Sequence, residues 1–395
     1  MENPKIRFKG FTKDWEQRKL SDVVNIGSGM DYKHLGEGNI PVYGTGGYMC
    51  SVDKALSNDK DAIGIGRKGT IDKPYILRAP FWTVDTLFYC IPKEGYDLDF
   101  TSCLFQNVDW KKKDESTGVP SLSKLIISNV ETYTPTYDEQ KKIGEYFQSL
   151  DHLITLHQRK CEQTKNLKKY MLQKMFPQNG AKVPEIRFDG FTYDWEQRKL
   201  GEVLISLQNN TLSRADLSYE TGIAKNVHYG DVLIKFGDVL DVSREQLPMI
   251  KDEKILDKYK ASFLQNGDVI IADTAEDTTV GKCSEIAGLS DEVVLSGLHT
   301  IPYRPVEKFA TGYLGYYLNS SAYHNQLIPL MQGIKVTSIS KSAMQDTDIV
   351  YPKSKEEQAM IGSYFQSLDH LITLHQRKCD ELKKMKKYML QNMFI

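Results

Sequence analysis

Hydrophobic residues in segment 139–176 recur at alternating intervals of four and three. The pattern opens with Ile143, Phe147, Leu150 and Ile154. This is the spacing of a coiled-coil seam. The segment contains no proline and is followed directly by Pro177, so the pattern predicts one long helix. A helix of these 38 residues would be about 57 Å long at 1.5 Å per residue.

The helical segment returns 218 residues later, at 357–394, and nine of the 38 positions differ. The stretch FQSLDHLITLHQRKC is identical in residues 147–161 and 365–379. The second seam opens with Ile361, Phe365, Leu368 and Ile372. A helix this long has few ways to bury its apolar stripe except against its own copy. We therefore expect the two helices to pack antiparallel about a pseudo-two-fold axis, with a pair of ordinary core helices as the alternative.

A second repeat pairs residues 4–20 with residues 184–200, and 14 of the 17 positions match. The intervening inserts, 21–137 and 201–355, differ in length and share little sequence. A constant frame around two dissimilar inserts indicates that the frame serves one shared partner, while each insert recognises something different.

The inserts contain short strand-like runs separated by Gly, Asn and Asp, as turns would separate them. These runs are 61–66, 81–91, 268–273 and 293–303. The expected fold class is therefore α+β, with two mixed globular domains separated by two long, antiparallel, coiled-coil-like helices. Residues 177–183 are expected to link the first helix to the second copy of the frame.

The composition is that of an ordinary soluble protein, with 395 residues, 40% hydrophobic and 26% charged residues, and a net charge of −1. There is no apolar run of about 18 residues and no signal-like N-terminus. The six cysteines are scattered without a CxxC pair, as in reduced cytosolic proteins. These features predict a cytoplasmic protein that does not insert into membranes.

Motifs for catalysis are missing from the sequence. The segment Gly64–Thr70 has two glycines of a phosphate loop but lacks the following lysine. No NPPY or DPPY tetrapeptide of an amino-methyltransferase occurs, and no HExxH or GxSxG. The histidines of each helix are five residues apart, which places them on different faces. We therefore expect neither a catalytic site nor a metal site.

The duplicated motifs resemble the specificity (S) subunit of type I restriction-modification enzymes over essentially the whole chain. The sequence WEQRKL occurs at 15–20 and 195–200, and the helices open with Asp138-Glu139-Gln140 and Glu356-Glu357-Gln358. One departure is that the usual Pro-Pro-x-x-Glu-Gln run is PTYDEQ at 135–140.

The resemblance implies two target recognition domains, each binding one half of a bipartite site in double-stranded DNA. These would be residues 1–137 and, after a linker, 178–355. Spacer helices at 138–177 and 356–395 would hold them apart and recruit two methyltransferase (M) subunits. Restriction (R) translocase-nuclease subunits would join for cleavage. S-adenosylmethionine, ATP and Mg would bind to the partner subunits, leaving this chain without a catalytic role.

Candidate DNA readers lie in loops near the strand-like runs. In the first insert they are Gly44, Thr45, Gly46, Gly47, Tyr48, Arg67, Lys68, Thr70, Lys73 and Trp82. In the second insert they are Asp273, Thr274, Thr278, Lys335, Thr337 and Ser338. Arg and Lys suit guanine O6 and N7, whereas an acidic residue can accept from the cytosine amino group. The competing interpretations are solvated loop residues, a plain tight turn for 44–47 and a core position for Trp82.

The charge of the inserts opposes simple DNA binding. Residues 21–137 carry a net charge of −3 and residues 201–355 carry −5, whereas phosphate-binding surfaces are normally cationic. Either partner subunits neutralise the phosphates, or the basic residues gather on one face. Two other classes of protein remain as alternatives: a stand-alone duplicated DNA-binding regulator, and an adhesive protein whose helices only self-associate.

Overall fold

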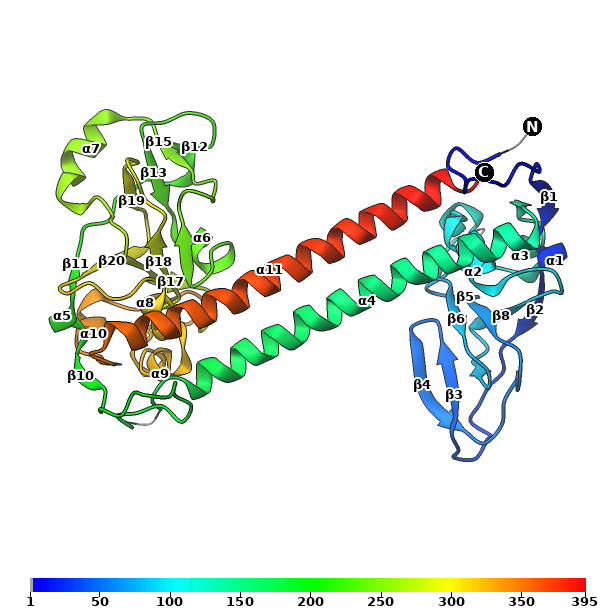
Figure 1. Cartoon of the computed structure of the whole chain (residues 1–395), viewed down its shortest axis with the longest axis horizontal. Helices are drawn as coiled ribbons and strands as arrows, with labels where there is room; N and C mark the ends of the chain where they lie inside the picture. The colour runs from blue at the N-terminus through cyan, green and yellow to red at the C-terminus, as the bar shows by residue number, and fades with distance from the viewer. Residues whose placement is uncertain (1–2, 115, 179) are drawn as a thin grey trace. The chain divides into compact units, whose positions relative to one another are not determined.

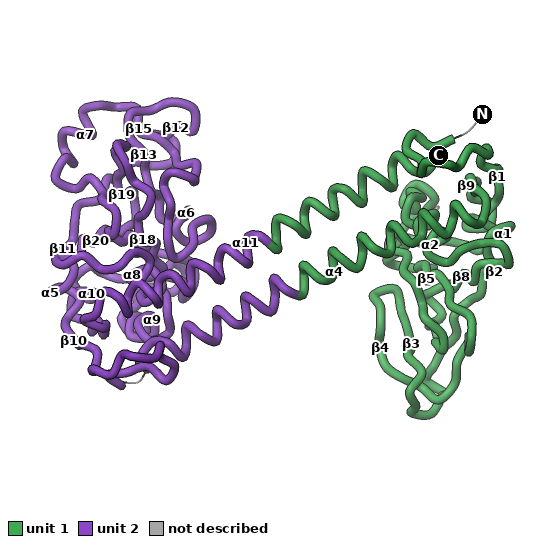
Figure 2. Tube along the Cα trace, viewed as in Figure 1, with its two compact units in different colours: residues 1–159, 375–395 green, residues 160–374 purple. Residues whose placement is uncertain are grey.

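The computed structural model describes residues 3–114, 116–178 and 180–395, and Figure 1 labels its helices and strands. The chain forms two units, Met1–Arg159 with His375–Ile395 (unit 1) and Lys160–Leu374 (unit 2), which are coloured separately in Figure 2. Each unit contains one insert, one copy of the N-terminal frame segment, and parts of both long helices.

Unit 1 is built on a four-stranded sheet of order β2-β8-β5-β6 and a three-stranded sheet of order β4-β3-β7. Its strands are β1 (Glu16–Lys19), β2 (Val24–Ser28), β3 (Ile40–Gly44), β4 (Gly47–Val52), β5 (Ala62–Gly66), β6 (Tyr75–Leu77), β7 (Trp82–Thr83), β8 (Leu87–Pro92) and β9 (Glu131–Thr134). Its shorter helices are α1 (Leu20–Val23), α2 (Leu98–Asn107), the 3-10 turn η1 (Trp110–Lys113) and α3 (Lys124–Ser128). Strand β5 is buried along its whole length and shares one core with α2.

Unit 2 has sheets of order β11-β20-β16-β18-β14 and β12-β15-β13-β19. Its strands are β10 (Glu196–Lys199), β11 (Leu204–Ser206), β12 (Leu217–Ser218), β13 (Ala224–Val227), β14 (Val239–Asp241), β15 (Met249–Ile250), β16 (Val269–Ala272), β17 (Thr274–Ala275), β18 (Cys283–Ala287), β19 (Val294–Ser296), β20 (Thr300–Pro305), β21 (Thr337–Ser338) and β22 (Asp348–Tyr351). Its shorter helices are α5 (Leu200–Val203), η2 (Arg214–Asp216), α6 (Tyr229–Ile234), α7 (Glu253–Tyr259), η3 (Lys260–Ser262), α8 (Tyr313–Asn319), α9 (Ser321–His324), η4 (Ile328–Leu330) and α10 (Lys341–Gln345).

The two inserts share one topology despite their dissimilar sequences. The strand order β2-β8-β5-β6 in unit 1 matches β11-β20-β16-β18 in unit 2, and β4-β3-β7 matches β15-β13-β19. In the second sheet of both units the last pair, β3 with β7 and β13 with β19, is parallel. The additional strands β12 and β14 and the helix α7 belong to the longer second insert. The two inserts are therefore structural copies as well as occupants of equivalent places in the sequence.

The strand predictions are confirmed for 61–66 and 268–273, which contain β5 and β16. The runs 81–91 and 293–303 are not single strands. Each breaks into two, β7 and β8 or β19 and β20, because the chain crosses from one sheet to the other within the run. The bends between these strands lie at 84–86 and 297–299.

The two long helices are α4 (Tyr137–Lys174) and α11 (Lys355–Asn392), each beginning and ending two residues before the predicted segment. In unit 1, Asp151 accepts from Lys386 at 2.7 Å, and His157 Nδ1 lies 3.0 Å from His375 Nδ1. In unit 2, Lys168 donates to Asp369 at 2.5 Å. Residues early in one helix thus meet residues late in the other, which confirms the antiparallel pairing within each unit.

The predicted seam residues pack inside the chain. Ile143, Phe147, Leu150, Ile154, Ile361, Phe365 and Leu368 are buried, while Ile372 is half-buried. Each seam also contacts a phenylalanine that lies two residues beyond the end of the other helix. The Phe394 ring lies 6.0 Å from that of Phe147 in unit 1, and the Phe176 ring lies 5.8 Å from that of Phe365 in unit 2.

The N-terminal frame segment ties each insert to both helices. In unit 1, β1 pairs antiparallel with β9, and Arg7 donates two hydrogen bonds to Glu139 at 2.6 and 2.7 Å. The Ile6 N–H donates to the Asn392 carbonyl at 2.8 Å. The corresponding contacts in unit 2 are β10 with β22, Arg187 with Glu357, and Ile186 with Lys174. The repeated sequence therefore forms the same set of contacts in both units.

No helix in the described parts of the chain is long and apolar enough to cross a membrane.

Candidate nucleic-acid interface

Arg67 and Lys68 emerge at the end of the buried strand β5, and both are exposed. The loop 116–124 crosses this strand end. The Leu122 N–H donates to the Arg67 carbonyl at 2.9 Å, and the Gly69 N–H donates to the Pro120 carbonyl at 2.8 Å. Backbone hydrogen bonds on both sides of Lys68 therefore fix the backbone from which the two cations project.

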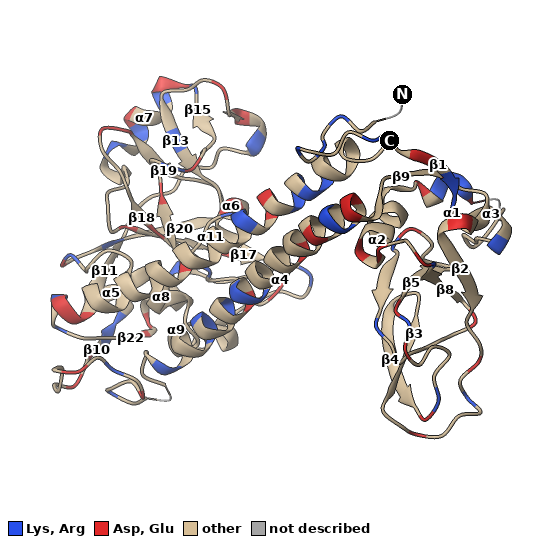
Figure 3. Cartoon of the chain, turned by 45° about the vertical axis from the view of Figure 1, so that its right-hand side comes forward, with Lys and Arg blue, Asp and Glu red and all other residues tan. Residues whose placement is uncertain are grey.

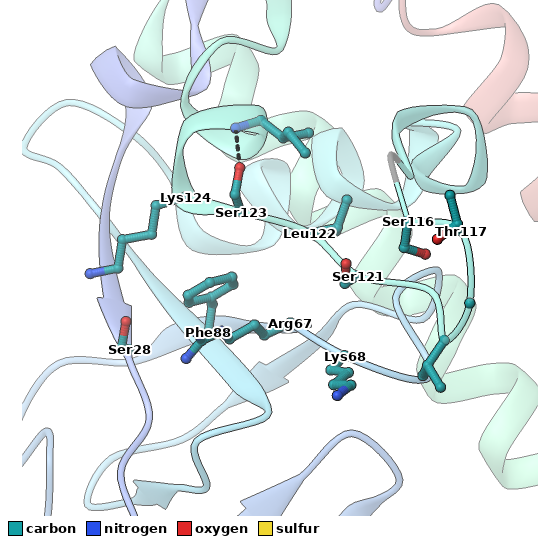
Figure 4. Close-up of a pocket in the computed structure, with 13 residues that line it drawn as sticks. Ser28, Arg67, Lys68, Phe88, Ser116, Thr117, Ser121, Leu122, Ser123 and Lys124 are labelled. Carbon is teal, nitrogen blue, oxygen red and sulfur yellow. Dashed lines mark hydrogen bonds between the residues drawn. The ribbon is translucent and has the colours of Figure 1, made fainter.

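A cavity of about 880 Å³ opens between this strand end and the loop (Figure 4). Three cations line it, Arg67, Lys68 and Lys124, together with hydroxyl groups of the loop such as those of Ser121 and Ser123. The Arg67 guanidinium carbon lies 5.8 Å from the centre of the Phe88 ring. No carboxylate lines the cavity among the residues that the structure describes. The site thus suits a ligand that carries acceptors and negative charge.

Asp114 organises the loop that forms this cavity. Its Oδ1 accepts from the N–H groups of Ser121 and Ser116, both at 3.0 Å. These two backbone hydrogen bonds, first that of Ser121, hold the pKa of Asp114 below its usual value. The ionised carboxylate of Asp114 thus accepts the two hydrogen bonds that organise the loop.

The turn Gly44–Tyr48 lines a second cavity of about 820 Å³, together with Lys33, Asp85 and Thr86. Thr45 and Gly46 form a two-residue hairpin turn between β3 and β4, which confirms a tight turn here, while contact of this turn with DNA stays a prediction. Tyr48 is 64% exposed. The Thr86 carbonyl accepts from the Arg67 N–H at 2.8 Å, which places Arg67 next to the wall of this second cavity.

Trp82 is a core residue and does not belong to this surface. Its side chain is 6% exposed and packs with Val42, Val52 and Val84. Its Nε1 donates to the Met30 carbonyl at 2.9 Å, which occupies the one polar group of the indole. The candidate role of Trp82 as a DNA reader is therefore wrong.

Thr70 and Lys73 follow Arg67 and Lys68 without lining either cavity. Thr70 is half-buried and Lys73 is exposed. Their contact with DNA stays a prediction.

Asp273 in unit 2 occupies the place of Arg67 in unit 1. It follows β16, its carbonyl accepts from the Ile339 N–H at 2.9 Å, and its own N–H donates to the His299 carbonyl at 3.2 Å. Thr274 pairs with Ser338 between β17 and β21, as Lys68 pairs with Ser121. The backbone contacts of Asp273 and Arg67 are therefore equivalent in the two units. Thr337 lies in the same strand pair, while Thr278 and Lys335 are exposed in adjoining loops.

A short motif that sequence analysis missed supports this alignment. Residues 121–124 read SLSK and residues 338–341 read SISK. In both copies the second serine caps a helix: Ser123 accepts from the Ile126 N–H at 3.1 Å, and Ser340 from the Ala343 N–H at 3.2 Å. The following lysines, Lys124 and Lys341, are exposed. The missed signal was a four-residue repeat inside inserts that otherwise look unrelated.

Acidic and basic residues alternate along the ribbon in both units (Figure 3). The cluster of Arg67, Lys68 and Lys124 is therefore a local feature of an insert whose net charge is negative. In unit 2 the matching positions carry Asp273, Thr274 and Lys341. The two sites have one backbone plan, but their charges are opposite at the position of Arg67 and Asp273.

Within the described part of the chain, no group of three or more His, Cys, Asp or Glu residues is placed to bind a metal ion. Burial raises the pKa values of the thiols of Cys90 and Cys103, which disfavours the nucleophilic thiolate.

Glu285 is buried, and its carboxylate accepts from the N–H groups of Gly312 at 2.6 Å and Gly315 at 3.0 Å. The Glu285 carboxylate therefore accepts hydrogen bonds from backbone N–H groups at the N-terminal end of α8.

Comparisons with known proteins agree with the internal duplication of the chain. A family model described as type I restriction modification DNA specificity domain matches residues 12–166 and 193–384. A type I restriction enzyme specificity subunit named MjaVIII from Methanocaldococcus jannaschii is 26% identical over 288 residues, covering 71% of this chain and 65% of the relative. A putative specificity subunit named MjaX from the same organism is 23% identical over 210 residues, covering 51% of this chain and 45% of the relative. The chain thus spans less than two thirds of the length of these relatives.

Two solved structures share the fold. The S subunit of a type I restriction-modification system from M. genitalium aligns with a TM-score of 0.65 at 12% identity, covering 100% of this chain and 99% of the other. A chain from a study of complex assembly and conformational transition in a type I R-M system gives 0.53 at 17% identity, covering 97% and 98%. Because the family match covers both inserts and most of both helices, this chain belongs to the type I restriction-modification DNA specificity family.

Proposed function

We propose that this chain is the specificity subunit of a type I restriction-modification complex. Each insert reads one half of a bipartite double-stranded DNA target, and the helical frame recruits two M subunits. R subunits join that complex for cleavage. S-adenosylmethionine, ATP and Mg belong to the M and R subunits.

The observation that carries this proposal is that both units have the same loop architecture at this site but present different side chains from it. Arg67 and Lys68 in unit 1 occupy the places of Asp273 and Thr274 in unit 2. Donors and acceptors presented to base edges in the major groove distinguish base pairs. The opposite charges of Arg67 and Asp273 at one matching position therefore support reading of different sequences by the two inserts.

The negative net charge of both inserts favours binding within a complex. Phosphate contacts supply much of the affinity of DNA-binding proteins, and cations supply those contacts. We infer that the M subunits neutralise most of the phosphates, while this chain contributes base contacts. Tight, specific DNA binding by the chain alone would instead favour a stand-alone regulator.

The experiment is to purify the chain with its M subunits and map the methylated adenines in genomic DNA. A bipartite motif is expected. Replacing residues 21–137 with the corresponding insert of a relative should change one half of the motif and leave the other intact, because both junctions lie in the repeated frame. A change in both halves together would contradict separate reading.

Exposed apolar residues on the helices support recruitment of two copies of one partner. They occur in pairs 218 residues apart: Leu153 and Leu371 (39% and 41% exposed), Leu167 and Met385 (44% and 47%), and Tyr170 and Tyr388 (49% and 58%). The first pair lies in the identical 15-residue stretch. Packing inside the chain does not require identity at exposed positions, whereas two equal docking surfaces would.

Tyr170→Ala and Tyr388→Ala test this recruitment. Each single variant is expected to lose one of two M subunits in native mass spectrometry, and the double variant both. Tyr193→Ala is the matched control, since Tyr193 is 87% exposed but its counterpart in the repeat is Lys13. Full occupancy by M subunits in the double variant would exclude these tyrosines from the interface.

A further inference from the structure

His299 is held in an uncommon backbone conformation beside the candidate reading site of unit 2. Its φ is +56°, and it is the one residue other than glycine with a positive φ in the described part of the chain. Such residues are uncommon, although histidine is among those enriched there. They persist where surrounding contacts hold them, often at functional sites. In unit 1 the equivalent residue is Thr86, whose carbonyl accepts from Arg67 as the His299 carbonyl accepts from Asp273.

The contacts of His299 position its imidazole. The ring packs edge-to-face on Tyr229 at a centroid distance of 5.2 Å, and Tyr229 packs on His228 at 4.7 Å. Nδ1 of His299 lies 3.4 Å from Asp273 Oδ1. The side chain is nevertheless 47% exposed. The imidazole therefore packs against Tyr229 and remains partly exposed to solvent.

Asp273 is oriented by its neighbours in the same way. Its Oδ1 accepts from the Thr274 hydroxyl at 2.7 Å and faces His299. The side chain is 26% exposed. The contacts seen among the described residues engage Oδ1, so Oδ2 is available to accept a further hydrogen bond. A carboxylate that accepts hydrogen bonds and an imidazole that can donate one thus stand side by side.

We propose that Asp273 and His299 together read one C·G base pair in the half-site bound by the second insert. Asp273 accepts from the cytosine N4 amino group, the usual acidic contact in the major groove. His299 donates through Nε2 to the guanine O6 of the same pair in its imidazolium form, in which both ring nitrogens carry a proton and Nδ1 faces the Asp273 carboxylate. A C·G edge presents that amino donor next to that keto acceptor. This inference rests on the proposed DNA-reading function. It adds the two residues that would determine specificity for one base pair of the second half-site.

The unit 1 site provides the physical contrast. There Arg67 and Thr86 stand where Asp273 and His299 stand in unit 2. A guanidinium donates and cannot accept, so it cannot contact cytosine N4 in the manner of Asp273. The two inserts would accordingly favour different bases at the equivalent position of their half-sites.

The test uses the complete complex with its M subunits and a library of targets in which each position of the second half-site is varied. Asp273→Asn is expected to change the preference at one position from cytosine to adenine, because asparagine pairs with adenine N6 and N7. His299→Gly keeps a residue that tolerates positive φ and is expected to relax the same position by roughly tenfold or more. Glu276→Gln, an exposed acid in the neighbouring loop, is the matched control and should leave the preference unchanged.

The outcomes separate this inference from the broader proposal. A wild-type complex without a bipartite motif would overturn the DNA-reading function itself. A clear wild-type motif that stays unchanged in both variants would overturn only the roles of Asp273 and His299. Equal loss of methylation on all targets, with unchanged thermal stability, would also overturn them, since it indicates a sequence-independent contact. Adenine at this position in the wild-type motif would contradict the C·G assignment.

Discussion

Arg67 and Asp273 show how much a residue's place along a strand can reveal. Both directly follow an apolar run, so sequence alone placed them at strand ends, and the backbone contacts agree. His299 could not be found in this way, because its bend is hidden inside the apolar run 293–303. The candidate role of Trp82 was wrong for a related reason, because the sequence pattern around it does not distinguish a buried indole from one at the surface.

Arg67→Ala tests base reading in the first half-site. Removing a bidentate contact to guanine is expected to cost about 1–3 kcal/mol, or roughly five- to 150-fold, at one position only. Lys124→Ala should instead weaken binding equally on all sequences and lower the salt dependence, as loss of a phosphate contact does. Quantitative methylation of a target library at two salt concentrations measures both. Lys54→Ala, an exposed lysine elsewhere in the insert, should behave like wild type.

Glu285 predicts a pH dependence of stability. Burial raises its pKa to about 7 from an ordinary value of 4.5, so the folded chain holds this proton more tightly than the unfolded chain. Its favourable contribution is fully present below pH 4.5 and is lost as the pH rises to about 7, a change of about 3 kcal/mol. Urea unfolding at pH 5 and 7.5 should show a smaller difference for Glu285→Gln than for wild type. The exposed Glu253→Gln should keep the wild-type difference; an equally steep Glu285→Gln profile would reject this origin.

At the scale of elements, the long helices were predictable and the sheets were not. Helix periodicity is local, and the internal repeat supplied the partner of each helix. The pairing of β5 with β8 and of β16 with β20 joins residues distant in sequence, and runs of apolar residues do not encode which strand lies beside which. The helix seam also separates two kinds of leucine: Leu150 is 5% exposed, and Leu153, less than one turn later, is 39% exposed.

Leu150→Asp and Leu153→Asp form a matched pair that separates folding from recruitment. Aspartate at the buried position 150 places an unpaired charge in the seam at a cost of several kcal/mol, so we expect a lowered melting temperature and loss of assembly. Aspartate at position 153 should leave the melting temperature near wild type and weaken association with M subunits. Normal assembly of the Leu153→Asp variant would remove this leucine from the proposed docking surface.

For the whole molecule, both long helices take part in both units. The seam contacts of unit 1 use α4 up to Ile154 and α11 from Cys379, and unit 2 uses α4 from Cys161, whose Sγ lies 3.8 Å from the Ile372 carbonyl. A change in the length of one helix alone would therefore shift the register of a seam in one of the units. If the helices set the gap between half-sites, both must be lengthened together.

Insertion of four residues after Lys160 and another four after Lys378 meets this requirement. Both sites lie between the seam contacts of the two units, so those contacts can persist, while the contact between His157 and His375 is expected to be lost. Each insertion adds about 6 Å of helix and rotates the following residues by about 400°, which leaves the apolar stripe some 40° out of phase. With DNA rising about 3.4 Å per base pair, the gap in the methylated motif should grow by one or two base pairs. Both half-sites should keep their bases because no reading loop is altered.

Insertion after Lys378 alone is the control and should lower stability or assembly. An active double-insertion complex with an unchanged gap would show that the helices do not set the spacing.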